Sequence, residues 1–98
     1  MMVEARTEVI MVGHILENEI VFKLYDAIKD VEADVKHCEI SFTTLKDGIE
    51  KKRPSTMRFY LIGSVEEREM AVRIIEKLAR ENDLGVETIN YDKLWVRK

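Results

Sequence analysis

The stretch Thr7–Val31 constrains the fold more than any other feature, because a strand pattern gives way there to a helix pattern across one glycine. Thr7–Val12 is apolar on both faces at the two-residue period of a strand, which predicts a central strand covered on both sides. Gly13–Asn18 is the connection. Apolar residues then recur at helical spacing from Glu19 to Val31, so we expect a helix that packs back on the strand.

Three further strand patterns follow along the chain. Ala33–Leu45 is rich in strand-forming residues, and Lys46–Gly48 is a turn signal. The charged segment Lys51–Pro54 is typical of a hairpin tip, because proline cannot donate to a ladder and so marks the edge of the next strand. That strand is Ser55–Ile62, and the last one is Val86–Tyr91.

The second helix has the clearest start signal in the sequence. Ser64–Glu67 reads Ser-Val-Glu-Glu and matches a capping box, in which the serine accepts from the glutamate amide while the glutamate reaches back. Oppositely charged residues then recur four apart on the solvated side, and each such pair stabilises a helix by roughly 0.3 kcal/mol. These pairs are Glu69 with Arg73 and Glu76 with Arg80. The apolar stripes of the two helices are Ile20, Leu24, Ile28 and Val31, and Ala71, Ile74, Ile75 and Leu78.

The predicted order of elements is β-α-β-β-α-β. Right-handed crossovers then place both helices on one face of a four-stranded antiparallel sheet, so we predict an α+β, ferredoxin-like sandwich. A chain of 98 residues suffices for one core, and no linker is visible, so we expect a single domain over residues 1–98.

The sheet face away from the helices is expected to be apolar, because apolar residues occupy both faces of the strands. An exposed apolar patch of this kind usually marks an interface. Two coverings are open, a second protomer related by a two-fold axis or the apolar tail Leu94–Val96 folded back on its own sheet. The candidate interface residues are Tyr60, Ile62 and Trp95.

Charge and composition exclude several classes of partner. The net charge is −3, and the one basic run, Lys51–Arg53, is short, so we expect no nucleic-acid partner. No apolar run reaches the roughly 20 residues of a membrane span, and the N-terminus lacks the apolar region of a secretory signal. A single cysteine, Cys38, indicates a reducing compartment. We therefore expect a cytoplasmic protein without a membrane partner.

Motifs for catalysis or cofactor binding are missing. The sequence contains no G-x-G-x-x-G, Walker, G-x-S-x-G, H-E-x-x-H or C-x-x-C motif, so we expect no cofactor and a non-enzymatic role. His37 and Cys38 are neighbours in a strand and point to opposite faces, which disfavours a metal site. Cys38 is expected to be a small buried hydrophobe. If the protein is a small enzyme instead, His14 is its best candidate acid or base.

A small-molecule site is most plausible at the connection after the first strand. Gly13 permits a positive φ or close approach of a ligand to the backbone, and His14 can titrate near neutral pH. Glu17 and Glu19 stand at the helix start, which disfavours a phosphate and favours an amine or amide, such as an amino acid. A tight turn with ordinary helix capping is the alternative. The candidate ligand-binding residues are Gly13, His14, Ile15, Leu16, Glu17 and Asn18.

The layout resembles the ACT-like regulatory domains across nearly the whole chain. Val12–Ile15 and Arg53–Ser55 resemble the conserved domain of archaeal proteins related to lysine-oxoglutarate reductase/saccharopine dehydrogenase. Ala33–Val35 and Phe59–Gly63 are similar to the NIL domain of methionine-import ATPases.

This resemblance implies an amino acid or similar metabolite bound at a homodimer interface near the first-strand loop, with regulation of a partner enzyme or transporter. Carried over by position, it points to Gly13, His14 and Ile15–Asn18. Our first hypothesis is a ligand-binding regulatory homodimer. The second is an assembly subunit that docks through its sheet face without a ligand.

Overall fold

The computed structural model describes residues 5–41 and 54–91 in full, and elsewhere it describes only the backbone of four two-residue strands. The main elements are β2 (Arg6–Gly13), α1 (Ile20–Ile28), β3 (Asp34–Ser41), β6 (Ser55–Ile62), α2 (Val65–Glu81) and β7 (Gly85–Tyr91). The short strands are β1 (Met2–Val3), β4 (Thr44–Leu45), β5 (Gly48–Ile49) and β8 (Leu94–Trp95).

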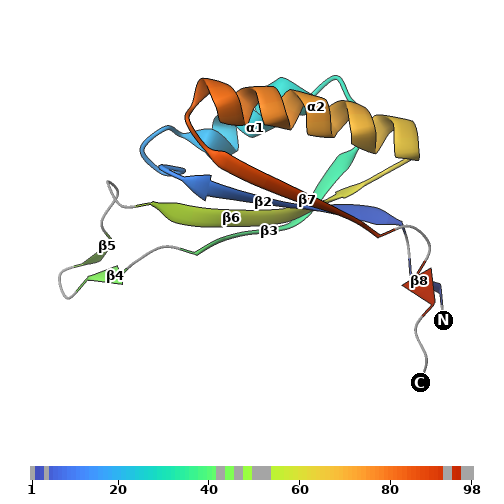
Figure 1. Ribbon diagram of the computed structural model, residues 1–98, viewed down its shortest axis with the longest axis horizontal. Coiled ribbons are helices and arrows are strands. Elements are labelled where there is room, and N and C mark those ends of the chain that lie inside the picture. Colours follow the sequence, from blue (N-terminus) through green and yellow to red (C-terminus); the bar gives the residue numbers. More distant parts are fainter. Residues whose placement is uncertain are drawn as a thin grey trace.

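The main strands form one antiparallel sheet in the order β3-β6-β2-β7, with β2 and β6 in the middle. Helices α1 and α2 lie side by side on the same face of this sheet (Figure 1). This is the ferredoxin-like arrangement, so the predicted fold class is confirmed.

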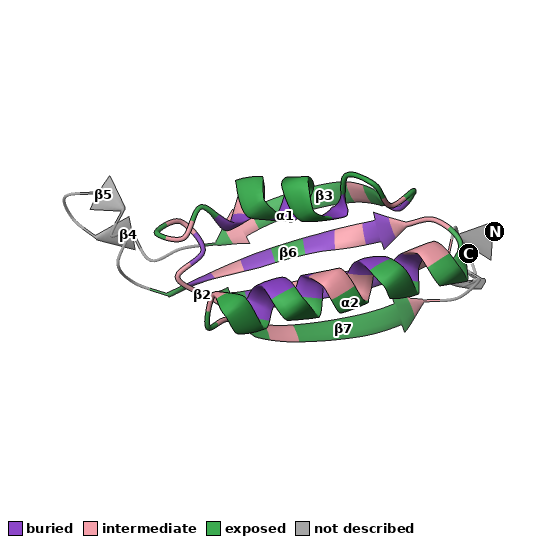
Figure 2. Cartoon of the chain, turned by 90° about the horizontal axis from the view of Figure 1, so that it is seen from above, coloured by how far each residue is buried: buried purple, intermediate pink, exposed green. Residues whose placement is uncertain are grey.

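The core lies between the helices and the sheet. Figure 2 shows the buried residues of α1 and α2 facing the strands, while the outer faces of both helices are exposed. Val31 and Ile74, the remaining members of the two predicted stripes, pack partly buried against the same core. The largest buried side chains of the core are Phe59, Met11, Ile15, Ile20, Leu24, Met57, Leu61, Ile75 and Val9.

Helix α1 is shorter than the sequence predicts. It begins at Ile20 and ends at Ile28, instead of running from Glu19 to Val31. Glu19 has a left-handed backbone (φ 53°), so it precedes the helix. At the other end, the Val31 amide donates to the Ile28 carbonyl at 3.0 Å, a tight turn that replaces the next helical turn.

The start of α2 follows the prediction in one half of the capping box only. Ser64 Oγ accepts from the Glu67 amide at 3.1 Å, as expected. The Glu67 carboxylate does not complete the box, because its Oε2 accepts from the backbone amide of Glu32 at 3.1 Å. Glu67 therefore ties the α1–β3 loop to the start of α2.

The sheet face away from the helices is not the apolar surface that the alternation suggested. Period two places Arg6 and Glu8 on the same face as Ile10 and Val12, and the register sets these residues beside the outward side chains of β6. Charged, aromatic and aliphatic side chains therefore alternate across this face. We call it the open sheet face; its described residues include Arg6, Glu8, Ile10, Val12, Asp34, Lys36, Thr56, Arg58, Tyr60, Ile62, Glu87, Ile89 and Tyr91.

The remaining predictions concern segments near the chain ends and the β3–β6 connection. Leu94–Trp95 pairs with Met2–Val3 rather than with the four-stranded sheet, and β4 pairs with β5, as a turn between them requires. The predicted turn residues 46–47 and the basic run 51–53 lie outside the described residues, as do Val96 and the side chain of Trp95. Within the described part of the chain, neither helix is long and apolar enough to cross a membrane.

Candidate functional site

The predicted ligand loop is closely packed at its first residue. Gly13 has φ +151°, and a Cβ placed there would lie only 2.5 Å from Cδ2 of Leu84. The side chain of Leu84 therefore occupies the space beside this glycine, and the positive φ disfavours a side chain at this position.

The other loop residues divide between the core and the surface. Ile15 is buried, while the half-exposed side chains of His14 and Glu17 form a pair with 3.4 Å between Nδ1 and Oε2. Glu19 precedes α1 and, among the described residues, gives no side-chain hydrogen bond to cap it. The loop thus brings His14 and Glu17 together at the surface and turns Ile15 away from them.

A polar cluster that the sequence analysis did not identify lies on the open sheet face. Its centre is Glu8, whose side chain is only 9% exposed. The hydroxyl of Tyr60 donates to Glu8 Oε2 at 3.2 Å, and the hydroxyl of Tyr91 donates to Oε1 at 3.3 Å. Nε of Arg58 lies 3.7 Å from the same carboxylate, and its Nη2 donates to Glu39 at 3.0 Å.

Arg6 completes this cluster by stacking on both tyrosines. Its guanidinium carbon lies 4.7 Å from the ring centroid of Tyr60 and 5.6 Å from that of Tyr91, within the range of cation–π attraction. Burial, and then the neighbouring Glu8 carboxylate, raise the pKa of the Tyr91 hydroxyl. The five residues Arg6, Glu8, Arg58, Tyr60 and Tyr91 are called the Glu8 cluster below.

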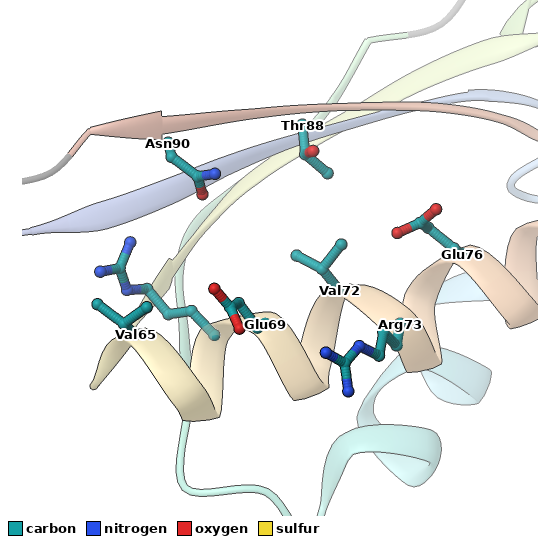
Figure 3. Close-up of a pocket in the computed structure, with 8 residues that line it drawn as sticks. Val65, Glu69, Val72, Arg73, Glu76, Thr88 and Asn90 are labelled. Carbon is teal, nitrogen blue, oxygen red and sulfur yellow. The ribbon is translucent and has the colours of Figure 1, made fainter.

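A groove runs between α2 and the edge strand β7. Its volume is about 220 Å³, and Figure 3 shows Thr88 and Asn90 pointing from β7 toward the helix. No residue of the predicted loop 13–18 is among the residues that line it. The groove is lined by Val65, Arg68, Glu69, Val72, Arg73, Glu76, Thr88 and Asn90.

One end of the groove is held by a directional chain of hydrogen bonds. Arg68 is 3% exposed, and its Nη1 donates to Thr7 Oγ1 at 3.1 Å while its Nε donates to the Gly63 carbonyl at 3.1 Å. The Thr7 hydroxyl donates in turn to Asn90 Oδ1 at 2.7 Å. Arg68 thus links α2 to β2 and, through Thr7, to β7.

The sequence carried a partial signal for these residues. Thr7 is a polar residue at a core-facing position, two residues before Val9, and Glu8 is an acidic residue in a strand otherwise read as central. Neither signal identifies the hydrogen-bond partners of these two residues, because the partners come from other elements: Arg68, Asn90, Tyr60 and Tyr91.

The pair His37–Cys38 does not form part of a site with metal-ligand geometry. In the described residues, no three His, Cys, Asp or Glu side chains gather closely enough to hold a metal ion. Cys38 is exposed, so its prediction as a buried hydrophobe is wrong. The reason is an irregularity of the edge strand β3, where the register shifts between Lys36 and Glu39 and His37 has φ 53°.

Comparisons with known proteins bear on the fold. No protein-family model matches the sequence, and no curated protein matches it. The structure is similar to the de novo designed protein Foldit4 (TM-score 0.64, 16% identity, 94% of this chain and 100% of that chain). It is also similar to the YXEP protein of Bacillus subtilis, a dinuclear metal-binding peptidase of the M20 family (TM-score 0.57, 16% identity, 92% of this chain).

This chain spans 26% of the length of that peptidase. A PII-like signaling protein from Thermus thermophilus has a TM-score of 0.47 at 18% identity, with 91% of each chain covered, a likeness too slight to bear on function. At identities this low, the likeness to the designed protein and to the peptidase shows a common fold and nothing about activity.

Proposed function

We propose that this protein is a regulatory module of the ACT-like kind, which binds a small amino-acid-like metabolite and works as a homodimer. The Glu8 cluster is the observation that carries the proposal. It is a hydrogen-bonded and stacked group of arginine, tyrosine and glutamate side chains on the open sheet face, the side of the sheet away from α1 and α2 (Figure 1).

The composition of this face supports an interface between copies. Interface cores are enriched in tyrosine and arginine, and energetically dominant contacts are often made by these residues. Around the cluster, Val12 is 47% exposed and Ile89 is 38% exposed, which supplies apolar surface to bury. Lys36 and Glu87 add charges of both signs on opposite edges, so two copies related by a two-fold axis can match their charges.

Regulation follows from differential affinity. A metabolite that binds one quaternary arrangement more tightly shifts the population toward it, by an amount set by the ratio of the two affinities. The His14–Glu17 pair offers polar groups for an amine or a carboxylate at the surface of the predicted loop. A partner enzyme or transporter would respond to the favoured arrangement.

The interface is tested by mass measurement on matched variants. Val12→Lys places a charge on the open sheet face, and Phe22→Lys places one on the helical side, where Phe22 is 77% exposed. Sedimentation analysis over a concentration series is expected to show a dimer for the wild type and for Phe22→Lys, and a monomer for Val12→Lys. A wild-type protein that stays monomeric contradicts the homodimer, and dissociation by Phe22→Lys alone moves the interface to the helical side.

The ligand is tested by melting temperature across amino acids and common metabolites. A ligand at about 100 times its dissociation constant stabilises the native state by roughly 2.7 kcal/mol, which shifts the transition visibly. His14→Ala is a better probe of the loop than a substitution at Gly13, because any side chain at Gly13 meets Leu84.

The second candidate function is an assembly subunit that docks through the open sheet face without a ligand. The same partly exposed aliphatic residues, Val12 and Ile89, favour it. A dimer whose melting temperature no metabolite changes would select this function over the first.

A further inference from the structure

We propose that two copies of the chain pack their open sheet faces together with the two-fold axis across the strands, so that Lys36 of each copy lies opposite Glu39 of the other. This inference rests on the proposed homodimer and goes beyond it, because it fixes how the copies are oriented and which residues meet. The strand register and the charges of the face support it.

The register arranges the open sheet face in rows that run across the strands. Each row takes one residue from β3, β6, β2 and β7 in turn, because paired residues lie side by side. Glu39 belongs to this face although an irregularity of β3 precedes it, since its carboxylate accepts from Arg58 at 3.0 Å. In order along β2, the rows are Asp34, Ile62, Arg6 and Tyr91; Lys36, Tyr60, Glu8 and Ile89; Glu39, Arg58, Ile10 and Glu87; and Ser41, Thr56, Val12 and Gly85.

Sheet packing leaves two choices for the axis. Two sheets that pack face to face in the aligned manner keep their strands within about 30° of one another. A two-fold axis in the interface must therefore run either along the strands or across them. Full overlap of the two faces places the first axis between β6 and β2, and the second between the row of Lys36 and the row of Glu39.

An axis along the strands brings like charges together. It exchanges β3 with the partner's β7 within each row, so Glu39 would lie opposite the partner's Glu87. Both residues are exposed and acidic, and opposed like charges weaken an interface. Lys36 would lie opposite the partner's Ile89 and would approach Glu87 only along a diagonal.

An axis across the strands brings opposite charges together instead. It exchanges the two central rows, so Lys36 lies opposite the partner's Glu39, and the symmetry makes this contact twice. Within the described residues, Lys36 forms no ion pair, so its charge is available for a partner. Tyr60 then lies opposite the partner's Arg58, a pairing that cation–π attraction favours. Among the residues of the rows, this axis opposes no two like charges.

A mixing experiment with two variants tests the orientation. Lys36→Glu opposes carboxylates in its own dimer, and Glu39→Lys opposes ammonium groups, whereas a dimer of one copy of each variant opposes only unlike charges. Sedimentation over a concentration series measures the dissociation constant of each dimer. Because the repulsion occurs twice, we expect each variant alone to dimerise at least about tenfold more weakly than the wild type. The equimolar mixture should return to within about threefold of the wild-type value.

Matched controls make the same charge changes elsewhere. Lys77→Glu and Glu76→Lys lie at exposed positions of α2, on the other side of the sheet (Figure 1), and should leave dimerisation unchanged alone or mixed. Circular dichroism checks that every variant keeps its fold. Mixing also separates an effect between copies from the loss of the Arg58–Glu39 bond within one chain, since adding Lys36→Glu cannot restore that bond.

The outcomes separate the orientation from the homodimer itself. Tighter association of Glu39→Lys alone would indicate the axis along the strands, where the new ammonium group meets the partner's Glu87, and would overturn the inference while leaving the homodimer in place. Variants that dimerise as the wild type does, or a mixture that stays monomeric, also overturn the orientation alone. A wild-type protein that stays monomeric overturns both.

Discussion

Thr7 and Asn90 lie 83 positions apart in the sequence, yet the Thr7 hydroxyl donates to Asn90 Oδ1 at 2.7 Å. The same hydroxyl accepts from Nη1 of the buried Arg68 at 3.1 Å. One threonine thereby joins the central strand β2 to helix α2 and to the edge strand β7.

Replacing Thr7 by valine is expected to destabilise the protein by about 1–3 kcal/mol, because Arg68 loses an acceptor in a buried site. Urea denaturation measures the change. Thr56→Val is the matched control on the open sheet face, since among the described residues Thr56 forms no side-chain hydrogen bond; it should change stability by less than about 0.5 kcal/mol. Equal effects of the two substitutions would contradict a structural role for the Thr7 hydroxyl.

Replacing Gly13 by alanine is expected to cost more than about 1 kcal/mol. The backbone has φ +151°, a conformation that L side chains rarely adopt, so the alanine backbone is strained, and the Leu84 side chain must move to make room for the new Cβ. Gly85→Ala is the control, because its Cβ would lie at an ordinary contact distance of 3.8 Å from the Val12 carbonyl oxygen. Thermal unfolding of both variants decides the matter, and a Gly13→Ala protein as stable as Gly85→Ala would count against this packing.

We expect the protein to lose stability at high pH because of Tyr91, which lies at the edge of the Glu8 cluster. The pKa of Tyr91 is raised above its ordinary value of 10.0 by burial and by Glu8, so the folded protein keeps a proton that the unfolded chain releases. The contribution to stability is therefore full below about pH 10 and declines as the pH rises through the folded pKa.

Phenolate absorbance measures this titration. We expect Tyr91→Phe to remove the tyrosine component that titrates above the ordinary pKa of 10.0. The free energy of unfolding, measured in urea, should then decrease less with rising pH than it does in the wild type. Tyr25→Phe, on the helical side of the sheet, should leave that component in place. A titration curve in which Tyr91→Phe removes a component at or below pH 10.0 would rule out the proposed environment.

Removing the cap of α2 is expected to cost about 1 kcal/mol. In Ser64→Ala the Glu67 amide loses the oxygen that accepts its proton at 3.1 Å, as in other helix N-cap substitutions. Ser41→Ala changes an exposed serine of β3 and serves as the control. Chemical denaturation that finds the two variants equally stable would show that the cap contributes nothing.

Several features of the fold could be predicted from local sequence patterns. The order of strands and helices, the buried stripe of each helix and the Ser64 cap depend on residues a few positions apart, and the structure confirms them. The predicted end of α1 lies three residues beyond the observed one, because a tight turn between Ile28 and Val31 replaces the last helical turn.

The open sheet face could not be predicted in the same way. Its apolar appearance depends on Ile10 and Val12 alone, whereas Arg6 and Glu8 occupy the same face, four and two positions before Ile10. Even with all four residues in view, the partners of Glu8 stay hidden, because Tyr60 and Tyr91 reach it only through the pairing of β2 with β6 and β7.

The sequence by itself therefore determined the order of the main elements and the buried stripe of each helix, since these follow from short-range periodicity. Only the tertiary structure decided which polar groups meet. Thr7, Arg68 and Asn90 meet because strand register and helix packing bring them within hydrogen-bond distance. A buried polar side chain is stable only with a partner, and its partner can lie anywhere along the chain.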